Sequence, residues 1–266
     1  YSVRGGSFDE NLIYVNGIEI YKSFLTKSAQ QEGLSFINPK LTSSIDFYAG
    51  GFEAKYGDKL SSVLDVKYKE PKKNKRSFSA SLMGTNLTIE GNNSNYRLSY
   101  ILGHRYKSNQ FLINSLDLDG NFVPTMHDFQ AYLTYQLTPE LQLNFLGYHS
   151  SNTYEMIPES RETQFGTITE SLQLTIYFDG QEINQYETAV GALATTYAPN
   201  KKLRLKFIAS GTRSIEEERF DIEGAYRLDE LDRDLGSEDF GESIATRGIG
   251  GFINHARNFL DVTIAT

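Results

Sequence analysis

The residues best suited to acid–base or metal chemistry are few and scattered in this chain of 266 residues. The four histidines show no His-x-x-x-His or similar ligand spacing, and we interpret them as satisfied or pore-lining side chains. They are His104, His127, His149 and His255. The absence of cysteine excludes disulfides, cysteine-ligated zinc and a cysteine nucleophile. Nothing in the sequence assembles a nucleophile, base and orienting residue, so we predict no enzyme activity, no cofactor and no metal site.

The excess of acidic residues limits which partners the protein can bind. The net charge of -8 argues against nucleic acid, because phosphate binding needs a basic surface. Much of the acid lies between Glu216 and Glu242, and we expect this stretch to be a solvated extracellular loop. Calcium binding and attraction of cationic ligands stay open as alternatives, since clustered carboxylates are hard oxygen ligands. The stretch has no EF-hand-like spacing, however.

Alternating strands are the elements that would position any site. One face of the first clear hairpin carries Phe129, Ala131, Leu133, Tyr135 and Leu137, and after a turn at 138–140 it continues with Leu141, Leu143 and Phe145. The intervening residues are mostly polar, so one face suits lipid and the other water. A second hairpin joins 186–198 to 203–215. Strand 94–106 follows the same pattern, with Ile101 as the exception.

The connections between these strands alternate between tight turns and long segments. Long connections are predicted at 107–125, at 153–185 and near 216–243. The predicted strands of 12 or 13 residues exceed the ~5–6 of globular sheets but suit a tilted membrane crossing of ~9–11 residues. This rhythm favours an outer-membrane β-barrel over a soluble antiparallel sheet. Eight strands are predicted, at 78–90, 94–106, 126–137, 141–152, 186–198, 203–215, 244–257 and 259–266.

The first 70 residues have a different pattern and form a small mixed α/β domain. Leu12 to Tyr21 reads as a hairpin, since Asn16-Gly17 can supply the positive φ angles of a tight turn. Further short strands are expected at 44–48 and 62–68, and 26–33 is loop or short helix. A basic linker at 71–77, with anionic lipid contact as the alternative to solvation, separates this domain from the strands of 78–266.

The two ends of the sequence bear on whether it is a piece of a longer polypeptide. The chain begins without a signal peptide and ends within a predicted strand, so we expect a piece of a longer polypeptide.

Four motifs occur in order in the N-terminal domain. They are Val3–Gly6, Leu12–Ile18, Ile45–Phe52 with Tyr56-Gly57, and Leu60–Val66. In order and spacing they resemble the plug domain of TonB-dependent outer-membrane receptors. The resemblance covers residues 1–70 by motif and the rest mainly by architecture. It implies residues 1–70 as the C-terminal part of a plug and 78–266 as about eight strands of a barrel of about 22.

The resemblance also implies a function and a location in the cell outer membrane. Such receptors bind a scarce, large nutrient and import it when the periplasmic TonB protein pulls on the plug through a segment upstream of this chain. Siderophores, vitamin B12, oligosaccharides and peptides are all family ligands. Outer-membrane lipid is a further expected partner, and a surface lipoprotein is one to consider. The alternative is an outer-membrane surface-recognition protein that transports nothing.

The resemblance marks a set of plug motif residues. They are Arg4, Gly5, Gly6, Asn16, Gly17, Gly50, Gly51, Tyr56 and Gly57. Ser7, Phe8, Asp9 and Glu10 are expected at a ligand-facing plug apex. Arg4 in a narrow lumen would need a carboxylate partner, because an unpaired charge away from water is costly. Asn16 and Gly50 depart from the family pattern, in which Asp and Arg are common at these positions, so a second plug-to-barrel salt bridge is in doubt.

Overall fold

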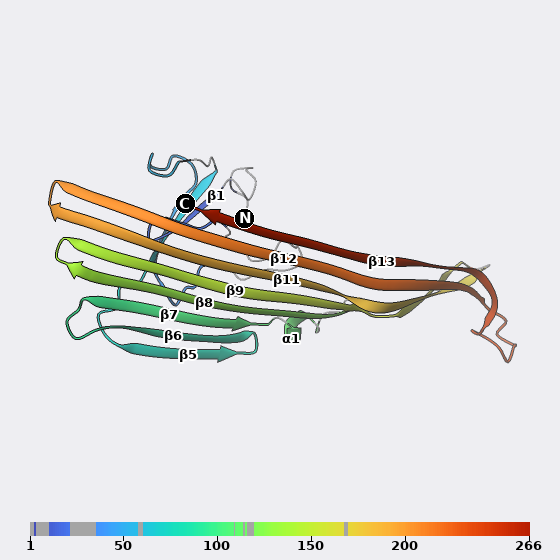
Figure 1. Cartoon of the computed structure of the whole chain (residues 1–266). Coiled ribbons are helices and arrows are strands. Elements are labelled where there is room, and N and C mark those ends of the chain that lie inside the picture. The colour runs from blue at the N-terminus through green and yellow to red at the C-terminus, as the bar shows by residue number, and fades with distance from the viewer. Residues whose placement is uncertain are drawn as a thin grey trace.

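The protein consists of a small sheet and a long sheet packed on one another (Figure 1). The computed structural model describes residues 3, 11–21, 36–57, 61–108, 110–113, 115, 120–167 and 170–266. Within these ranges no helix is long and apolar enough to cross a membrane, and the one helix, α1, covers only Gln110–Ile113.

The small sheet, here the N-terminal sheet, contains β1 (Asn11–Val15), β2 (Ile18–Glu19), β3 (Thr42–Tyr48) and β4 (Ser62–Tyr68) in the order β2-β1-β4-β3. Strands β1 and β4 are parallel, and the other pairs are antiparallel. The hairpin predicted at 12–21 is confirmed, with φ of 50° at Asn16 and 77° at Gly17. The segment 26–33 lies outside the described residues.

The long sheet is antiparallel throughout its described pairs. Its main path, here the wall, runs β13-β12-β11-β9-β8-β7-β6-β5, and β10 pairs with β11 beside it. The bounds are β5 (Lys75–Ser81), β6 (Gly84–Asn92), β7 (Leu98–Lys107), β8 (Gly120–Thr138), β9 (Leu141–Pro158), β10 (Arg161–Gly166), β11 (Ser171–Asn200), β12 (Leu203–Leu231) and β13 (Ser243–Ala265).

Two strand predictions are wrong. The stretch 78–90 is not one strand, because the chain turns at Leu82-Met83 between β5 and β6, and β5 begins as early as Lys75. An apolar dipeptide gives no turn signal of the kind that Gly, Asn or Pro would give. Conversely, 244–257 and 259–266 form the single strand β13.

The connections are asymmetric, as predicted, but the long ones are mostly strand. Tight turns at Pro139-Glu140 and Lys201-Lys202 lie at one end of the wall. At the other end β9, β11 and β12 continue through much of the predicted loops 153–185 and 216–243, and only 232–242 connects β12 to β13 (Figure 1). Where both faces meet water, a strand needs no apolar alternation, so the sequence pattern ended before the strand did.

The two faces of the wall differ as expected from the alternation. Phe145, Leu193 and Phe207 share the outer face and are exposed. The inner face is covered by the N-terminal sheet. Its contacting side chains Ile101, Tyr132, Leu146, Tyr148, Val190 and Ala192 form one buried core with side chains of the N-terminal domain.

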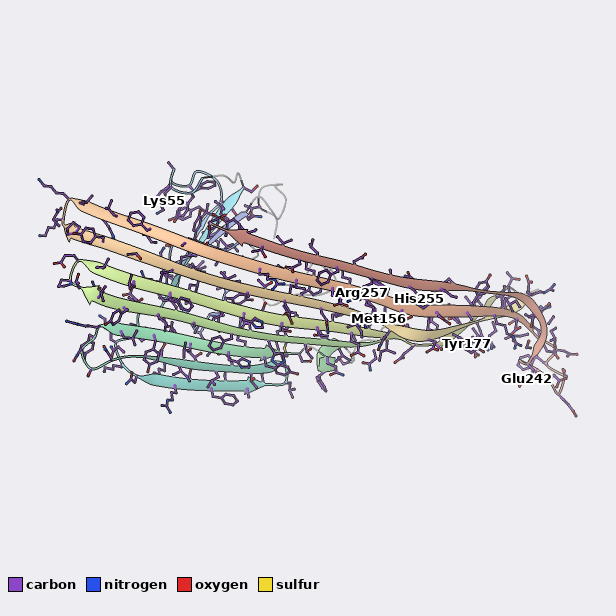
Figure 2. The ribbon with its side chains drawn as sticks, viewed as in Figure 1. Lys55, Met156, Tyr177, Glu242, His255 and Arg257 are labelled. Atoms are coloured by element: carbon purple, nitrogen blue, oxygen red, sulfur yellow. The ribbon has the colours of Figure 1, made fainter. Side chains whose placement is uncertain are left out.

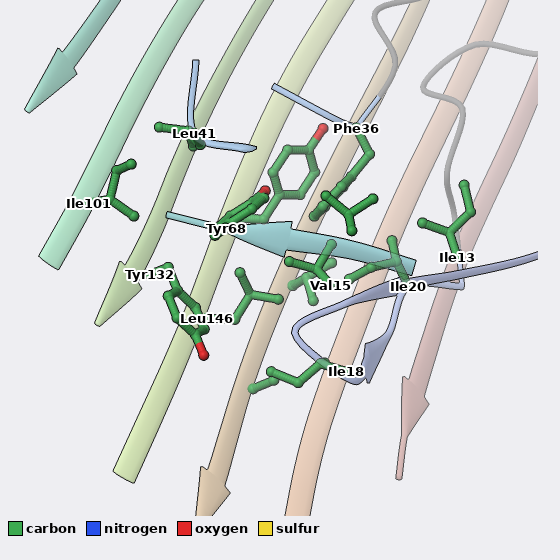
Figure 3. Close-up of a cluster of buried hydrophobic side chains, with 14 residues drawn as sticks. Ile13, Val15, Ile18, Ile20, Phe36, Leu41, Tyr68, Ile101, Tyr132 and Leu146 are labelled. Atoms are coloured by element: carbon green, nitrogen blue, oxygen red, sulfur yellow. The ribbon is translucent and has the colours of Figure 1, made fainter. Parts of the chain in front are cut away.

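Figure 3 shows this shared core, with β4 crossing the wall strands. The N-terminal domain contributes Ile13, Val15, Ile18, Ile20, Phe36, Leu41, Val66 and Tyr68. Ile101, the exception to the alternation of its strand, is 0% exposed and belongs to this core. Its position is therefore apolar because it faces the N-terminal domain, like the other wall side chains of this core. A smaller cluster of Leu12, Tyr56 and Val63 covers the opposite side of the N-terminal sheet.

The exposed outer face yields a depth-dependent prediction. Leu193 is 50% exposed and lies seven positions before the β11 terminus, within the length that a membrane crossing needs. Leu193→Arg is expected to destabilise the folded wall by about 2–4 kcal/mol, because arginine at mid-bilayer is costly. Heat-modifiable migration after urea titration in lipid measures the loss.

The control for this prediction is Ile249→Arg. Ile249 is 75% exposed and lies near the start of β13, beyond the crossing length. This change is expected to leave the urea midpoint in place. Equal effects of the two arginines would show that the exposed outer face does not lie in lipid.

Candidate functional site

The best-defined polar site lies where the N-terminal domain meets the inner face of the wall. The motif residues Arg4, Gly5 and Gly6 and the predicted apex Ser7, Phe8, Asp9 and Glu10 lie outside the described residues. Their roles stay predictions.

The Asn16-Gly17 turn joins the N-terminal sheet to the wall. Asn16 Oδ1 accepts a hydrogen bond from the backbone N of Tyr68 (3.1 Å), and Lys206 Nζ on β12 donates to the backbone O of Asn16 (3.2 Å). A Cβ added at Gly17 would lie 2.7 Å from Lys206 Nζ. The turn thus needs glycine for its positive φ, whereas the flexible Lys206 side chain could move aside.

The remaining motif residues lie on the side of the N-terminal sheet away from the shared core. Gly50 and Gly51 end β3 with φ of 79° and 67°, which L side chains rarely adopt. Tyr56 Oη donates to Asp65 Oδ2 (2.8 Å). Burial, reinforced by the Asp65 carboxylate, raises the pKa of Tyr56 to about 12. Gly57 has no positive φ and no atom within 4 Å of an added Cβ, so nothing in the structure explains its glycine.

A buried ion pair between β7 and β8 faces the N-terminal domain. The cross-strand register places Arg105 opposite Asp128, and Arg105 Nε donates to both carboxylate oxygens (2.9 and 3.0 Å), with Nη2 adding a further bond. Arg105 Nη1 also donates to the backbone O of Ile37 (3.1 Å), and Nη2 to that of Phe36 (3.5 Å). One guanidinium therefore connects two wall strands to the N-terminal domain.

Gln130 extends this network across the interface. Its Nε2 donates to the backbone O of Phe36 (2.6 Å) and to Asp128 Oδ2 (3.1 Å), while its Oε1 accepts from Tyr68 Oη (2.6 Å). Burial raises the pKa of Tyr68, so the phenol stays a donor. We call Arg105, Asp128, Gln130 and Tyr68 the latch.

Gly103 lets the chain of the N-terminal domain approach β7 beside the latch. A Cβ at this position would lie 3.0 Å from both methyl carbons of Leu41 and 3.1 Å from Asn38 Nδ2. Asn86 Nδ2 on β6 donates to Asn38 Oδ1 (3.3 Å), adding another polar contact.

Sequence reasoning missed the latch. It predicted 94–106 as an alternating strand without a partner for its polar residues, and it assigned the lumen-facing arginine to Arg4. The available signal was the pairing of 94–106 with 126–137, which would have set Arg105 near Asp128 once the register was known.

The latch holds the N-terminal domain on the wall by an ion pair and hydrogen bonds, without any covalent bond. A buried ion pair contributes little net stability compared with apolar packing, but it is costly to leave half-made. The latch therefore specifies one seated position of the N-terminal domain.

The histidines do not take part in the latch. His104, His127 and His149 are exposed and lie on the outer face, which the register shows by pairing His104 and His149 with Phe129. Of the two interpretations, satisfied or pore-lining, the pore-lining one does not fit these three, because they lie on the face away from the N-terminal domain. His255 is exposed and sits beside Asp221 (Nδ1–Oδ1 2.5 Å). The described residues contain no group of three or more His, Asp or Glu side chains placed to hold a metal ion.

We expect the loss of a buried ion pair and the loss of an exposed ion pair to differ in their effect on stability, although each pair joins adjacent strands. Asp128→Asn would remove the buried carboxylate that Arg105 Nε and Nη2 bond, and we expect a loss of about 3–5 kcal/mol. Asp261→Asn removes the partner of Arg213 on the exposed part of the wall (Nη2–Oδ2 2.7 Å) and is expected to have no measurable effect. Urea titration of both variants, followed by heat-modifiable migration, measures the two changes. Equal midpoints for the two would refute a structural role for the latch.

Comparison with known proteins gives one family match and several similar structures. Residues 1–63 match the family model of the TonB-dependent Receptor Plug Domain. A comparison with curated protein sequences finds no match.

Several solved structures resemble the chain. A mutant of the ferric enterobactin receptor PfeA from Pseudomonas aeruginosa is 12% identical, with 99% of this chain and 48% of that chain covered at a TM-score of 0.41. The ferripyoverdine receptor of the same organism is 10% identical, with coverages of 100% and 48% and a TM-score of 0.41. The siderophore receptor PirA from Acinetobacter baumannii is 14% identical, with coverages of 86% and 41% and a TM-score of 0.40. The chain spans about half the length of the first two structures.

The plug match covers the N-terminal domain, whose sheet packs against antiparallel strands with an exposed apolar outer face. The resemblance and the outer-membrane location predicted from the sequence motifs are confirmed. Residues 1–63 thus match the plug domain of TonB-dependent receptors, and the antiparallel strands of the wall follow this domain in the chain.

Proposed function

We propose that the receptor imports a scarce, large nutrient with energy transmitted by TonB. The observation that carries this proposal is the seating of the plug on the inner face of the wall, by a shared apolar core and by the latch. A domain that fills a lumen but is held only by non-covalent contacts can gate passage. The division into plug (1–70), linker (71–77) and barrel strands (78–266), closure by about 22 strands and the upstream TonB contact belong to the same proposal.

Gating requires that the seated and released plug differ in their contacts with ligand or with TonB. A ligand that bound both states equally would shift nothing, however tightly it bound. In the seated state, hydrogen bonds join Arg105 on β7 and Gln130 on β8 to the Ile37 and Phe36 carbonyls, so these bonds depend on the position of the plug. Pulling on the plug would break these bonds before the shared core can separate from the wall.

A surface-recognition protein without transport is the second candidate, and the distal strands favour it. They carry a groove of about 590 Å³ lined by Tyr177, Phe178 and Phe252, among others. In Figure 2, Tyr177 lies toward the far end of the wall, on the way to the distal loop that contains Glu242. Exposed aromatic side chains at such a place suit contact with another molecule.

Uptake distinguishes the two candidates. Cells with and without the intact receptor are given a labelled ferric siderophore, vitamin B12, an oligosaccharide and a peptide in turn. We expect receptor-dependent accumulation of at least one, lost on deletion of TonB or collapse of the proton gradient. Receptor-dependent binding without energised accumulation of any of the four would favour surface recognition.

A disulfide between plug and wall tests gating more directly. Because the chain has no cysteine and Gly103 Cβ would lie 3.0 Å from the Leu41 methyl carbons, Leu41→Cys with Gly103→Cys places two thiols close together. The oxidised double variant is expected to bind the nutrient identified above but not accumulate it. Reduction should restore accumulation, and each single variant should retain it under oxidation. Full accumulation by completely oxidised receptor would refute plug movement relative to β7.

A further inference from the structure

The basic residues of the linker 71–77 take no part in the latch or in the shared core. Lys72, Lys73 and Arg76 are all exposed. Within the part of the chain that the structure describes, none of these three side chains has an ion pair or a hydrogen bond. Three cations without partners therefore lie close together in a chain whose net charge is -8. We call Lys72, Lys73 and Arg76 the basic edge.

The register places Arg76 on the outer face of the wall. Phe78 on β5 lies opposite Leu87, which in turn lies opposite His104 on that face. Arg76 is two positions before Phe78, so the two side chains share a face. Phe78 is 68% exposed and Leu87 is 41% exposed. An exposed cation thus adjoins exposed apolar side chains on the side of the wall that faces lipid.

Asn92 on β6 fixes the linker at two points. Its Nδ2 donates to the backbone O of Pro71 (3.3 Å), and its backbone N donates to Asn74 Oδ1 (3.1 Å). Lys72 and Lys73 lie between these two contacts. The two lysines are therefore held beside the end of β6.

Gly91 shows on which side of β6 the linker lies. Gly91 has the same strand parity as Leu87, so a Cβ there would point to the outer face. Such a Cβ would overlap Asn74 Oδ1 and would lie 2.8 Å from Tyr100 Oη. The Asn74 amide therefore lies over the outer face of β6, and the linker is on the lipid side of the wall.

The position along the strand matches the boundary of a membrane. Strand β5 begins at Lys75, toward the end of the wall that carries the tight turns (Figure 1). On its outer face the side chains change from charged to apolar between Arg76 and Phe78. Tyr96, which is 74% exposed, lies in the neighbouring β6–β7 connection. Aromatic side chains gather at the interfaces of membrane barrels, so its place agrees with a boundary here.

Charge and apolar surface together indicate the occupant. Basic side chains at a membrane surface attract anionic headgroups, and acyl chains can cover the apolar side chains beside them. A soluble acidic polypeptide would match the charge but would leave Phe78 and Leu87 uncovered. A zwitterionic lipid would cover these two residues without compensating the basic edge. An anionic lipid satisfies both demands.

We propose that the basic edge binds the phosphate headgroup of an anionic phospholipid whose acyl chains lie on Phe78 and Leu87. The bound lipid is held at the junction between the N-terminal domain and the wall. The proposal does not depend on transport. It needs the outer face to lie in lipid, which the comparison of Leu193→Arg with Ile249→Arg tests separately.

Lipid binding to the purified intact receptor in detergent tests the proposal. Delipidated receptor is titrated with dioleoyl phosphatidylglycerol or with dioleoyl phosphatidylcholine, which has the same acyl chains and no net charge. Native mass spectrometry measures the bound lipid. We expect phosphatidylglycerol to bind about tenfold more tightly than phosphatidylcholine. The difference should shrink as the ammonium acetate concentration rises, because salt screens exposed charges.

The variant that removes the basic edge carries Lys72→Gln, Lys73→Gln and Arg76→Gln, and it should bind both lipids equally. The matched control is Lys75→Gln, because Lys75 adjoins Arg76 in sequence but lies on the inner face, opposite Glu90. This control should keep the preference for phosphatidylglycerol. Heat-modifiable migration checks that both variants are folded.

Equal affinity of the unaltered receptor for the two lipids would overturn the proposal, whether or not the triple variant folds. An equal loss of preference in the Lys75 variant would also overturn it. Displacement of phosphatidylglycerol by equimolar hexaglutamate or inorganic phosphate would overturn it too, because binding would then need no acyl chain.

Discussion

The constraint on which the structure depends is that successive side chains of a strand point to opposite faces. Half of the side chains of each wall strand must therefore suit contact with lipid, and the other half must suit contact with the plug or with water. On the outer face this gives exposed Phe145, Leu193 and Phe207. On the inner face the same strands change composition along their length, from the apolar contacts around Leu146 to the acidic side chains around Glu216. A shift of register by one residue would exchange the two faces at once, so the pattern fixes the pairing strongly.

Much of this arrangement could be predicted from sequence, because local rules and tertiary demands agree. The Asn16-Gly17 turn, the strand 62–68 and the exposed face of the 129–145 hairpin follow from turn chemistry and alternation alone. The rest depended on partners distant in sequence. Ile101 broke the alternation because it packs on a different domain, and the Arg105–Asp128 pair required the register of two strands. The distal strands were missed because a strand surrounded by water needs no apolar face, and backbone pairing leaves no signature in side-chain pattern.

The polar and apolar parts of the plug interface do different physical work. Apolar packing is insensitive to orientation, so the shared core alone would permit the plug to settle in several positions. The latch removes this freedom, since Arg105 and Gln130 find acceptors only where the Phe36 and Ile37 carbonyls face them. Apolar packing thus supplies attraction between the plug and the wall, and the directional bonds of the latch select one of the positions that this packing would allow. Gly103 adds to the specification, because a Cβ there would already lie 3.0 Å from the Leu41 methyl carbons, which leaves space for a small side chain only.

Magnitudes indicate which part keeps the lumen closed at rest. The buried apolar side chains that the plug contributes to the shared core are each worth about 1.5–3 kcal/mol, and part of this burial is against the wall. The latch hydrogen bonds to the plug contribute only about 0.5–1.5 kcal/mol each, since water replaces them on release. Release of the N-terminal domain would expose the apolar side chains to water, whereas water would replace the polar bonds of the latch. The apolar packing is therefore the larger contribution to holding this domain on the wall, and the latch decides the position in which it is held.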